Sequence, residues 1–189
     1  MKVFDFDNTL YNGESAIDFV LYLIKGNKKI LLWLPRIGIG LLKYKMCLVG
    51  KDAIESQLNA FLKFVATDGR DLKETVADFW SKYEKNLKPE LCKLVEKGDA
   101  IITGSPWFLI DGIKEKLGTS NLICSDFDMV KYHINYLNYG ENKVKKYHEA
   151  YGDKLIDAFY TDSYNDQPMM DISKEVYLVT KNKVEKIKG

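Results

Sequence analysis

Residues 3–10 read VFDFDNTL, and this stretch decides the fold. Its apolar half predicts a short buried strand, and two carboxylates follow at Asp5 and Asp7. Side chains two positions apart on an extended chain point to the same side, so both carboxylates and Thr9 share one face. Two carboxylates this close repel each other unless a cation lies between them. The stretch therefore predicts either a cation site or a strand-end turn with capping carboxylates.

The rest of the chain alternates short apolar strands with helices. Strands are expected at 100–103, 121–124, 158–161 and 176–179, a hairpin over 127–138, and helices at 89–98, 106–117 and 142–152. Such alternation predicts a parallel sheet with helical crossovers. Residues 13–86 carry only helix-period apolar patterns. The fold class is thus α/β: a Rossmann-like parallel sheet core (1–12 and 87–189) with an inserted all-helical cap domain (13–86).

Length and composition narrow the class of protein. The chain has 189 residues, 46% of them hydrophobic, which is enough for a real core. A net charge of +1 gives no case for a nucleic-acid partner. Cys47, Cys92 and Cys124 lie far apart, as ordinary thiols of a reducing compartment do. Neither a secretory signal nor an apolar run of about 20 residues is seen, so we expect a cytoplasmic protein.

A second polar segment follows the strand at 100–103. Thr103 ends that strand, and Gly104, Ser105 and Pro106 lead into a predicted helix. A hydroxyl and free backbone N–H groups at a helix N-terminus form an anion site. A plain helix cap would give the same pattern, so this segment alone leaves both interpretations open.

Two further segments carry charge near predicted strand ends. Lys143 lies at the start of a helix, where a cation opposes the helix dipole and so needs a reason. Lys145 and Lys146 lie close by, so either of them could be the functional cation at this helix start instead of Lys143. Asp162 and Asp166 follow the strand at 158–161, at the edge where an open α/β sheet binds ligands.

Taken in this order, the four segments resemble the four signatures of the haloacid dehalogenase-like hydrolase superfamily, which begin with DxDx[TV]. The resemblance implies that Asp5 is a nucleophile forming an aspartyl-phosphate, and that Asp7 is general acid and then base. It also implies a phosphate site and an Mg²⁺ site. The phosphate ligands are Thr103, Gly104 and Lys143; the metal ligands are Asp5, the Asp7 carbonyl, Asp162 and, in the outer position, Asp166.

The chain repeats the Asp-Phe-Asp tripeptide at Asp126-Phe127-Asp128, again after an apolar strand. This copy lacks a threonine two residues further on, so we expect it in a solvated turn or hairpin. His133 and His148 have no partner pattern that matches a catalytic or metal site. We expect both to be structural or solvated.

The cap contains an unusual segment, residues 30–45, which reads ILLWLPRIGIGLLKYK. Pro35, Gly38 and Gly40 should kink or break a helix here. No acidic residue lies between Phe19 and Lys51, and seven cations do: Lys25, Lys28, Lys29, Arg36, Lys43, Lys45 and Lys51. Two interpretations remain, a helix buried against the other cap helices or an interfacial segment facing anionic lipid.

A helical insert at this point resembles the phosphoserine-phosphatase-like branch of the superfamily. The cap segment, together with 102–106 and 162–168, looks like the bacterial phosphatidylglycerophosphatase C type. That likeness implies a lipid phosphate substrate, such as phosphatidylglycerol phosphate, and peripheral contact at the inner membrane face. A phosphatase of a small soluble metabolite and a non-catalytic phosphate-binding protein are the alternatives. The sequence does not predict an oligomeric state.

Overall fold

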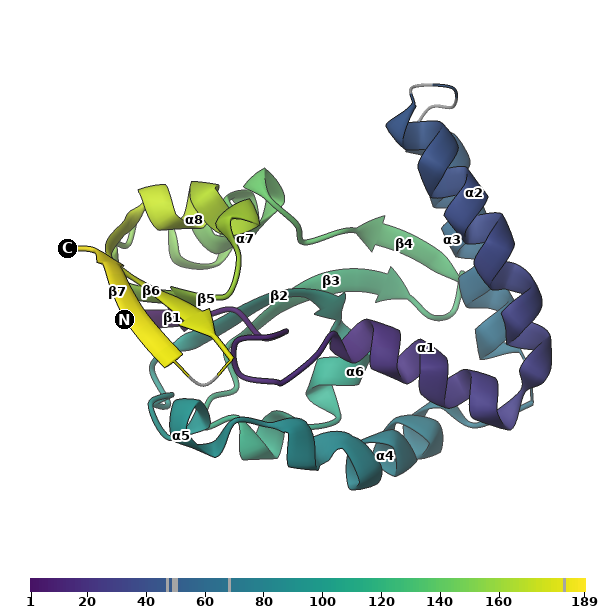
Figure 1. Cartoon of the computed structure of the whole chain (residues 1–189), viewed down its shortest axis with the longest axis horizontal. Coiled ribbons are helices and arrows are strands. Elements are labelled where there is room, and N and C mark those ends of the chain that lie inside the picture. Colours follow the sequence, from purple (N-terminus) through teal and green to yellow (C-terminus); the bar gives the residue numbers. More distant parts are fainter. Residues whose placement is uncertain (47, 49–50, 68, 182) are drawn as a thin grey trace.

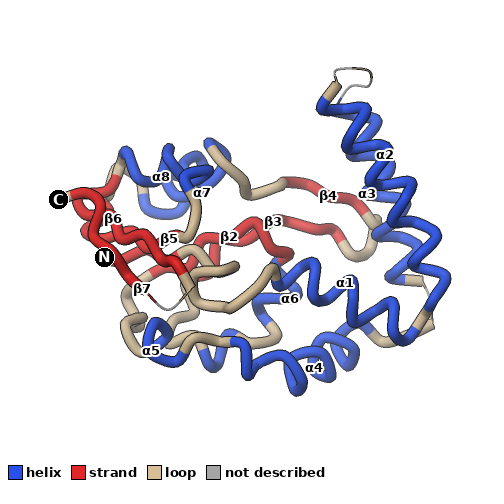
Figure 2. The backbone as a smooth tube through the Cα atoms, viewed as in Figure 1, coloured by secondary structure: helices blue, strands red, loops and turns tan. Residues whose placement is uncertain are grey.

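A computed structural model describes the whole chain except residues 47, 49–50, 68 and 182. Its core is a seven-stranded sheet in the order β4-β3-β2-β1-β5-β6-β7, parallel except for the two edge strands β4 and β7 (Figures 1 and 2). The strands are β1 (Lys2–Phe4), β2 (Ala100–Pro106), β3 (Leu122–Asp128), β4 (His133–Tyr136), β5 (Ile156–Thr161), β6 (Ser173–Thr180) and β7 (Lys183–Lys188). The predicted α/β class is confirmed.

Helices fill the connections between the strands. The α-helices are α1 (Ser15–Gly26), α2 (Trp33–Lys45), α3 (Lys51–Ala66), α4 (Leu72–Tyr83), α5 (Pro89–Cys92), α6 (Trp107–Asp111), α7 (Glu141–Tyr151) and α8 (Gln167–Asp171). Single 3₁₀ turns are η1 (Lys28–Leu32), η2 (Glu84–Asn86), η3 (Lys114–Lys116) and η4 (Tyr164–Asp166). In its described residues, the predicted insert therefore consists of α1 to α4 with η1 and η2.

Strand β1 lies at the centre of the sheet because its side chains are buried on both faces. Val3 pairs with Ala100 of β2, and Phe4 pairs with Tyr160 of β5. Val3 joins the hydrophobic cluster under α7 and α8, whereas Phe4 joins the cluster on the opposite face. This alternation is the period of two expected of a strand. Asp5 then follows directly at the carboxyl end of the central strand.

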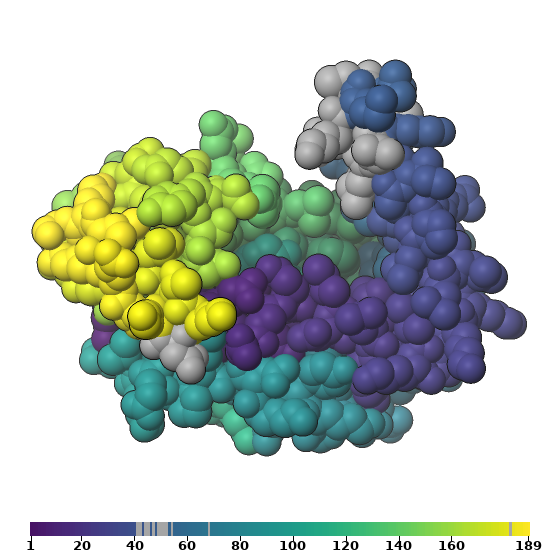
Figure 3. Space-filling view, viewed as in Figure 1, coloured from purple at the N-terminus to yellow at the C-terminus, as the bar shows by residue number. Residues whose placement is uncertain are grey.

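The insert does not have a hydrophobic core of its own among the described residues. Phe19 of α1 and Phe79 and Trp80 of α4 belong to the same cluster as Phe6 and Tyr11 of the core. Helices α2 and α3 instead form an arm that projects from the body (Figures 1 and 3). The arm meets the core at the β3–β4 hairpin. The backbone N–H of Ile134 donates to the side-chain oxygen of Asn59, and the side-chain nitrogen of Asn59 lies 2.9 Å from His133 Nδ1.

Helix α2 runs unbroken through Pro35, Gly38 and Gly40, so of the predicted kink or break at these residues the break is wrong. Pro35 lies in the first turn, where an amide N–H would have no helical partner to lose. The chain changes direction earlier, at Asn27 between α1 and η1. In the described part of the chain, no helix has the length and apolar character needed to cross a membrane.

Two predicted helices are shorter than expected. The helix predicted at 106–117 begins at Trp107 and ends at Asp111. A Cβ on Gly112 would lie 2.4 Å from Cγ1 of Val76, which shows how closely α4 approaches the chain there. The helix predicted at 89–98 is the single turn α5. This close approach of α4 just after the first of these helices was not visible in the sequence.

Candidate active site

A pocket of about 350 Å³ lies beyond the carboxyl ends of β1 and β5, the edge at which ligands bind open α/β sheets. It gathers residues from five separate parts of the chain. Its lining residues are Asp5, Asp7, Glu14, Ala16, Gly104, Ser105, Tyr139, Lys143, Asp162, Ser163, Asn165 and Asp166. Every predicted site residue is among them except Thr103, which is fully buried.

A buried ion triad forms one wall of this pocket. Lys143 Nζ lies 2.8 Å from Asp5 Oδ1 and 2.8 Å from Asp166 Oδ2, and all three side chains are buried. Burial raises the pKa of Asp5 to about 7; the Lys143 ammonium opposes this rise, and the Asp166 carboxylate adds to it. Lys143 is charged despite its burial, because the two carboxylates outweigh desolvation and raise its pKa.

The triad explains why a cation lies at the start of α7. The favourable contact with two buried carboxylates outweighs the unfavourable end of the helix dipole. Lys145 is exposed, and Lys146 pairs with Glu149 on the outer side of α7, so neither takes the place of Lys143. Asp166 also accepts a hydrogen bond of 2.9 Å from Thr161. In this arrangement Asp166 orients Lys143, and its predicted role near a metal stays a prediction.

Asp7 is held by donors from two distant segments. Its Oδ2 accepts a hydrogen bond of 2.7 Å from the Ser105 hydroxyl, and its Oδ1 accepts one of 2.7 Å from the Ser15 backbone N–H. The Thr103 hydroxyl lies 3.4 Å from Oδ2. Ser105 lies in the second polar segment of the sequence, where no pattern predicts this contact with Asp7. No signal in the sequence pointed to Ser15.

Hydrogen bonds hold the carboxyl-terminal part of β2, residues 103–105, in place. The Thr103 hydroxyl accepts the Ser105 N–H at 3.1 Å, and the Gly104 carbonyl accepts from the Ser125 hydroxyl at 2.6 Å. Asn138 is buried, and its amide nitrogen donates to the carbonyls of Thr103 and Ile123. These bonds fix the backbone of Gly104 where it faces the pocket.

Comparison with protein families identifies this arrangement. The model of haloacid dehalogenase-like hydrolases matches residues 3–171, which include the whole pocket. The chain belongs to the haloacid dehalogenase-like hydrolase family. The family predicted from the four segments is thereby confirmed. Comparison with curated proteins gives no match.

Solved structures agree with the fold of a haloacid dehalogenase-like hydrolase. A Bordetella pertussis Tohama I protein of unknown function has a TM-score of 0.73 at 17% identity, over 93% of this chain and 87% of that one. A phosphoserine phosphohydrolase-like protein from Francisella tularensis subsp. tularensis SCHU S4 has a TM-score of 0.55 at 19% identity, over 93% and 86%. Cytosolic 5′-nucleotidase IIIB scores 0.53 at 10% identity, over 91% and 68%.

The oxygen donors of this hydrolase pocket fit Mg²⁺. Burial raises the pKa of Asp162, and the charge of Asp166 adds to the rise; burial likewise raises that of Glu14, with Asp7 and Asp162 contributing. Five carboxyl groups line the pocket, and Lys143 is the one lysine among the described lining residues. In the described residues no three His, Cys, Asp or Glu side chains form a ready-made metal cluster. Two carboxylates, a main-chain carbonyl and water suit Mg²⁺, which keeps several waters.

Lys88 is a second buried cation that sequence reasoning missed. It lies just after the insert, and its ammonium donates to the backbone carbonyl of Asn8 in the loop that carries Asp5 and Asp7. Burial lowers the pKa of Lys88, and the Asp162 carboxylate opposes that shift. This hydrogen bond connects the loop that carries Asp5 and Asp7 to the residues that follow the insert.

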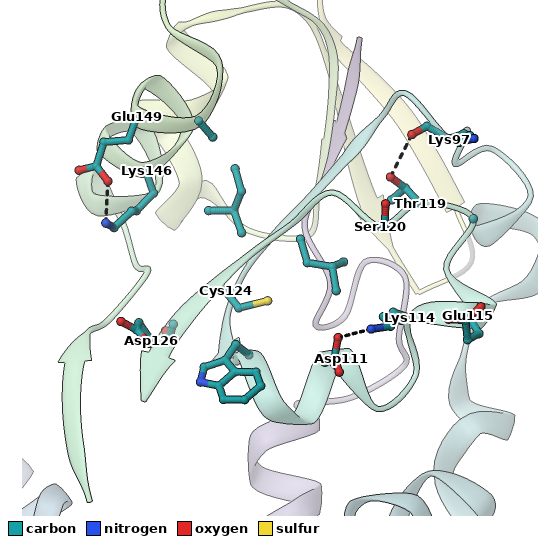
Figure 4. A pocket seen from close by; sticks show the side chains of 16 residues that line it. Lys97, Asp111, Lys114, Glu115, Thr119, Ser120, Cys124, Asp126, Lys146 and Glu149 are labelled. Atoms are coloured by element: carbon teal, nitrogen blue, oxygen red, sulfur yellow. Dashed lines mark hydrogen bonds and ion pairs between the residues drawn. The ribbon is translucent and has the colours of Figure 1, made fainter. Parts of the chain in front are cut away.

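A larger hollow lies elsewhere, along the outer side of β3 (Figure 4). Its volume is about 920 Å³, yet its charged side chains are mostly paired, as Asp111 with Lys114 and Lys146 with Glu149. Burial raises the pKa of the Cys124 thiol to about 12, so it stays protonated and unreactive. This hollow lacks the chemistry of the smaller pocket. His133 and His148 lie in neither.

Proposed function

We propose that this hydrolase is an Mg²⁺-dependent phosphatase that cleaves phosphate monoesters through an aspartyl-phosphate at Asp5. The observation that carries the proposal is the triad, in which Lys143 holds a buried carboxylate at the centre of the sheet. A carboxylate nucleophile must be ionised, and a cation 2.8 Å away favours that form. The same cation suits a phosphoryl oxygen once a substrate enters.

The first step forms the acyl phosphate. An Asp5 carboxylate oxygen attacks phosphorus in line with the ester oxygen, and the bond from phosphorus to that oxygen breaks. Asp7, protonated, gives its proton to the leaving oxygen. Lys143 and the Gly104 N–H would stabilise the non-bridging oxygens. Bound Mg²⁺ would be held by Asp5, the Asp7 carbonyl and Asp162, and it supplies neutralisation of phosphoryl charge.

The second step returns the protein to its starting state. Asp7, now a carboxylate, takes a proton from water, and the water oxygen attacks the phosphorus of the aspartyl-phosphate. The bond from phosphorus to the Asp5 oxygen breaks, which releases inorganic phosphate and restores both carboxyl groups.

Hydrolysis of p-nitrophenyl phosphate tests this proposal directly. Activity is expected with Mg²⁺ and is expected to vanish in excess chelator. Acid quenching during turnover should trap phosphate on Asp5 as a hydroxylamine-sensitive acyl phosphate. Phosphate binding without any turnover would instead identify a non-catalytic phosphate-binding protein.

Metal binding has a readout that does not depend on turnover. Relief of repulsion in the acidic pocket should make Mg²⁺ stabilise the fold. At 100 times its Kd the gain is about 2.7 kcal/mol, which for a chain of this size raises Tm by roughly 5–10 °C. Asp162→Asn should reduce this rise. An unchanged Tm over a wide range of Mg²⁺ concentration would contradict the proposed site.

For the substrate we propose a lipid phosphate such as phosphatidylglycerol phosphate, because η1 and α2 expose apolar side chains beside cations. Leu32 is 77% and Ile39 55% exposed, and Leu31 and Leu34 are exposed as well. Lys28, Lys29, Arg36 and Lys43 are also exposed. This pattern favours the interfacial interpretation of residues 30–45 over the buried one.

A groove of about 680 Å³ between α2 and α3 adds to this support. The described residues that line it are apolar, small, polar or basic: Leu32, Trp33, Pro35, Arg36, Ile39, Gly40, Lys43, Ala53, Ser56, Gln57 and Ala60. Apolar contact and positive charge together suit an anionic membrane surface. The proposal therefore includes peripheral contact at the inner membrane face.

Vesicle co-sedimentation tests the membrane contact. Binding should rise with anionic lipid and fall with salt. Each cation near such a surface is worth about 1 kcal/mol, so replacing Lys28, Lys29 and Arg36 by Glu should weaken binding by several kcal/mol. The control reverses three exposed lysines on other faces, Lys73, Lys154 and Lys183. Wild-type protein that stays in the supernatant at low salt contradicts the membrane contact.

A soluble phosphorylated metabolite is the second candidate. The pocket of about 350 Å³ is small enough for a compact leaving group, and the Francisella protein of similar fold is described as phosphoserine phosphohydrolase-like. Comparison of kcat/KM for phosphoserine and for phosphatidylglycerol phosphate in mixed micelles distinguishes the two. A higher value for phosphoserine would replace the lipid proposal.

A further inference from the structure

The carboxylate of Asp7 is enclosed by a short chain of buried hydroxyl groups. Ser105 Oγ lies 2.7 Å from Asp7 Oδ2, and Ser15 Oγ lies 2.8 Å from Ser105 Oγ. Ser15 and Ser105 are almost completely buried. The two serines belong to different parts of the molecule, because Ser15 begins α1 and Ser105 lies near the end of β2.

The direction of these hydrogen bonds follows from proton counting. A carboxylate only accepts, so the single hydroxyl proton of Ser105 is directed at Asp7. Ser105 must then accept from Ser15, whose own hydroxyl proton completes the chain. Ser15 contributes a second bond, because its backbone N–H donates to Asp7 Oδ1 at 2.7 Å. Both oxygens of Asp7 are thus oriented, one by the core and one by α1.

We propose that Ser105 is a positioning residue that orients Asp7 for proton transfer, and that Ser15 couples this orientation to helix α1. The inference rests on the proposed phosphatase activity with Asp7 as its acid. Proton transfer depends steeply on the placement of the acid relative to the leaving oxygen. A side chain with free rotation about χ1 and χ2 would spend most of its time misaligned.

A hydroxyl suits this task because Asp7 changes its protonation state twice in each cycle. The Ser105 hydroxyl donates to the ionised carboxylate, and it can still donate to the unprotonated oxygen of the acid form, which leaves the acid proton for the leaving oxygen. An ammonium group in the same place would favour only the carboxylate. Serine therefore holds Asp7 in both the acid and the base steps without favouring one form strongly.

The leaving group provides a measurement that a merely structural role would not change. A nitrophenolate leaves without a proton, whereas a less acidic phenol needs one from Asp7. The value of kcat/KM covers only the steps through departure of the leaving group, so hydrolysis of the aspartyl-phosphate does not enter it. A defect in orienting the acid should thus grow as the leaving phenol becomes less acidic.

The experiment compares p-nitrophenyl, phenyl and p-methoxyphenyl phosphates with Mg²⁺. For Ser105→Ala we expect kcat/KM to fall about tenfold or more for the phenyl and p-methoxyphenyl esters, as for loss of a hydrogen bond to a charged group. It should change less than about threefold for the p-nitrophenyl ester. Ser15→Ala keeps the backbone N–H on Asp7, so it should give the same pattern with a smaller loss.

Ser173→Ala is the matched control, because Ser173 is also buried and its hydroxyl donates to the Met169 carbonyl, away from the pocket. It should leave all three values unchanged, and thermal unfolding should show that every variant is folded. An equal fall for all three esters in Ser105→Ala overturns the positioning role while leaving the proposed function intact. Wild-type protein that hydrolyses none of the esters overturns both.

Discussion

Two copies of the tripeptide Asp-Phe-Asp follow apolar strands in this chain, at residues 5–7 and 126–128, and they have opposite surroundings. Asp5 is 5% exposed and touches a buried ammonium, whereas Asp126 is exposed and accepts one hydrogen bond from Asn135. Phe6 is fully buried, and Phe127 only partly. The local sequences are identical for three residues, so the difference comes from the rest of the fold.

The position of the parent strand explains the difference. β1 has strands on both sides, so residues of β2, of α7 and of the segment after β5 all converge on the residue after it. At residues 126–128, β3 pairs with the edge strand β4, and Asp128 closes the hairpin by accepting from the N–H groups of Val130 and Lys131. The expected hairpin position is confirmed. A pair of carboxylates after a strand therefore forms a candidate active site only where the topology also places a cation and further acidic residues beside it.

The largest expected effect is the loss of turnover in Asp5→Asn. The amide keeps the shape of the side chain but is not a nucleophile, so kcat on p-nitrophenyl phosphate should fall by about a thousandfold or more. The matched change Asp126→Asn alters the same tripeptide at the hairpin and should leave kcat unaltered. If Asp5→Asn keeps a tenth of wild-type activity, the two copies are not functionally different.

The next largest effect concerns the cations beside the two copies. Lys143→Met leaves Asp5 and Asp166 buried without a counter-charge, which costs about 3–5 kcal/mol in unfolding free energy. For a chain of this size, that is a fall in Tm of roughly 6–20 °C. Lys131 is highly exposed and lies 3.7 Å from Asp128, so Lys131→Met should hardly change Tm. Similar Tm values for the two variants in thermal unfolding would contradict the difference in burial.

The smallest effect is a pH dependence of stability in metal-free protein. Burial raises the pKa of Asp5 from 3.8 to about 7, so between these values the folded state binds more protons than the unfolded state. Stability then falls as pH rises through this window. Asp5→Asn should remove this part of the slope, and Asp126→Asn should keep it. Urea unfolding in chelator at pH 5 and pH 8 measures it; a slope that survives in Asp5→Asn assigns it to another group.

Sequence reasoning found the residues that follow strands, because strand ends can be located from apolar patterns. Asp5 and Asp162 were placed in this way, Lys143 was placed at the start of a helix, and the structure brings all three to one pocket. It missed Ser15 and Lys88, which contact the first loop from the two ends of the insert. Those contacts join residues without any local pattern, so only the folded chain reveals them.

The predicted helix ends were wrong for a related reason. Apolar periodicity continues from Trp107 to Leu117, yet α6 stops where α4 packs against Gly112. The break expected within α2 failed because Pro35 falls in the first turn, where it is tolerated. Periodicity reports which face of a segment is buried, while its ends depend on neighbours that are distant in the sequence.

The central place of β1 also affects the order in which the chain folds. Val3 pairs with Ala100, and Phe4 pairs with Tyr160. The central strand of the sheet therefore cannot pair until segments that are synthesised much later are available. Helices form within microseconds from local contacts, whereas pairing over such separations is slow. The helices between β1 and β2 can therefore form while the apolar segment before Asp5 is still unpaired. We expect docking of β1 to limit the rate of folding, and with it the moment at which Asp5 and Lys143 first meet.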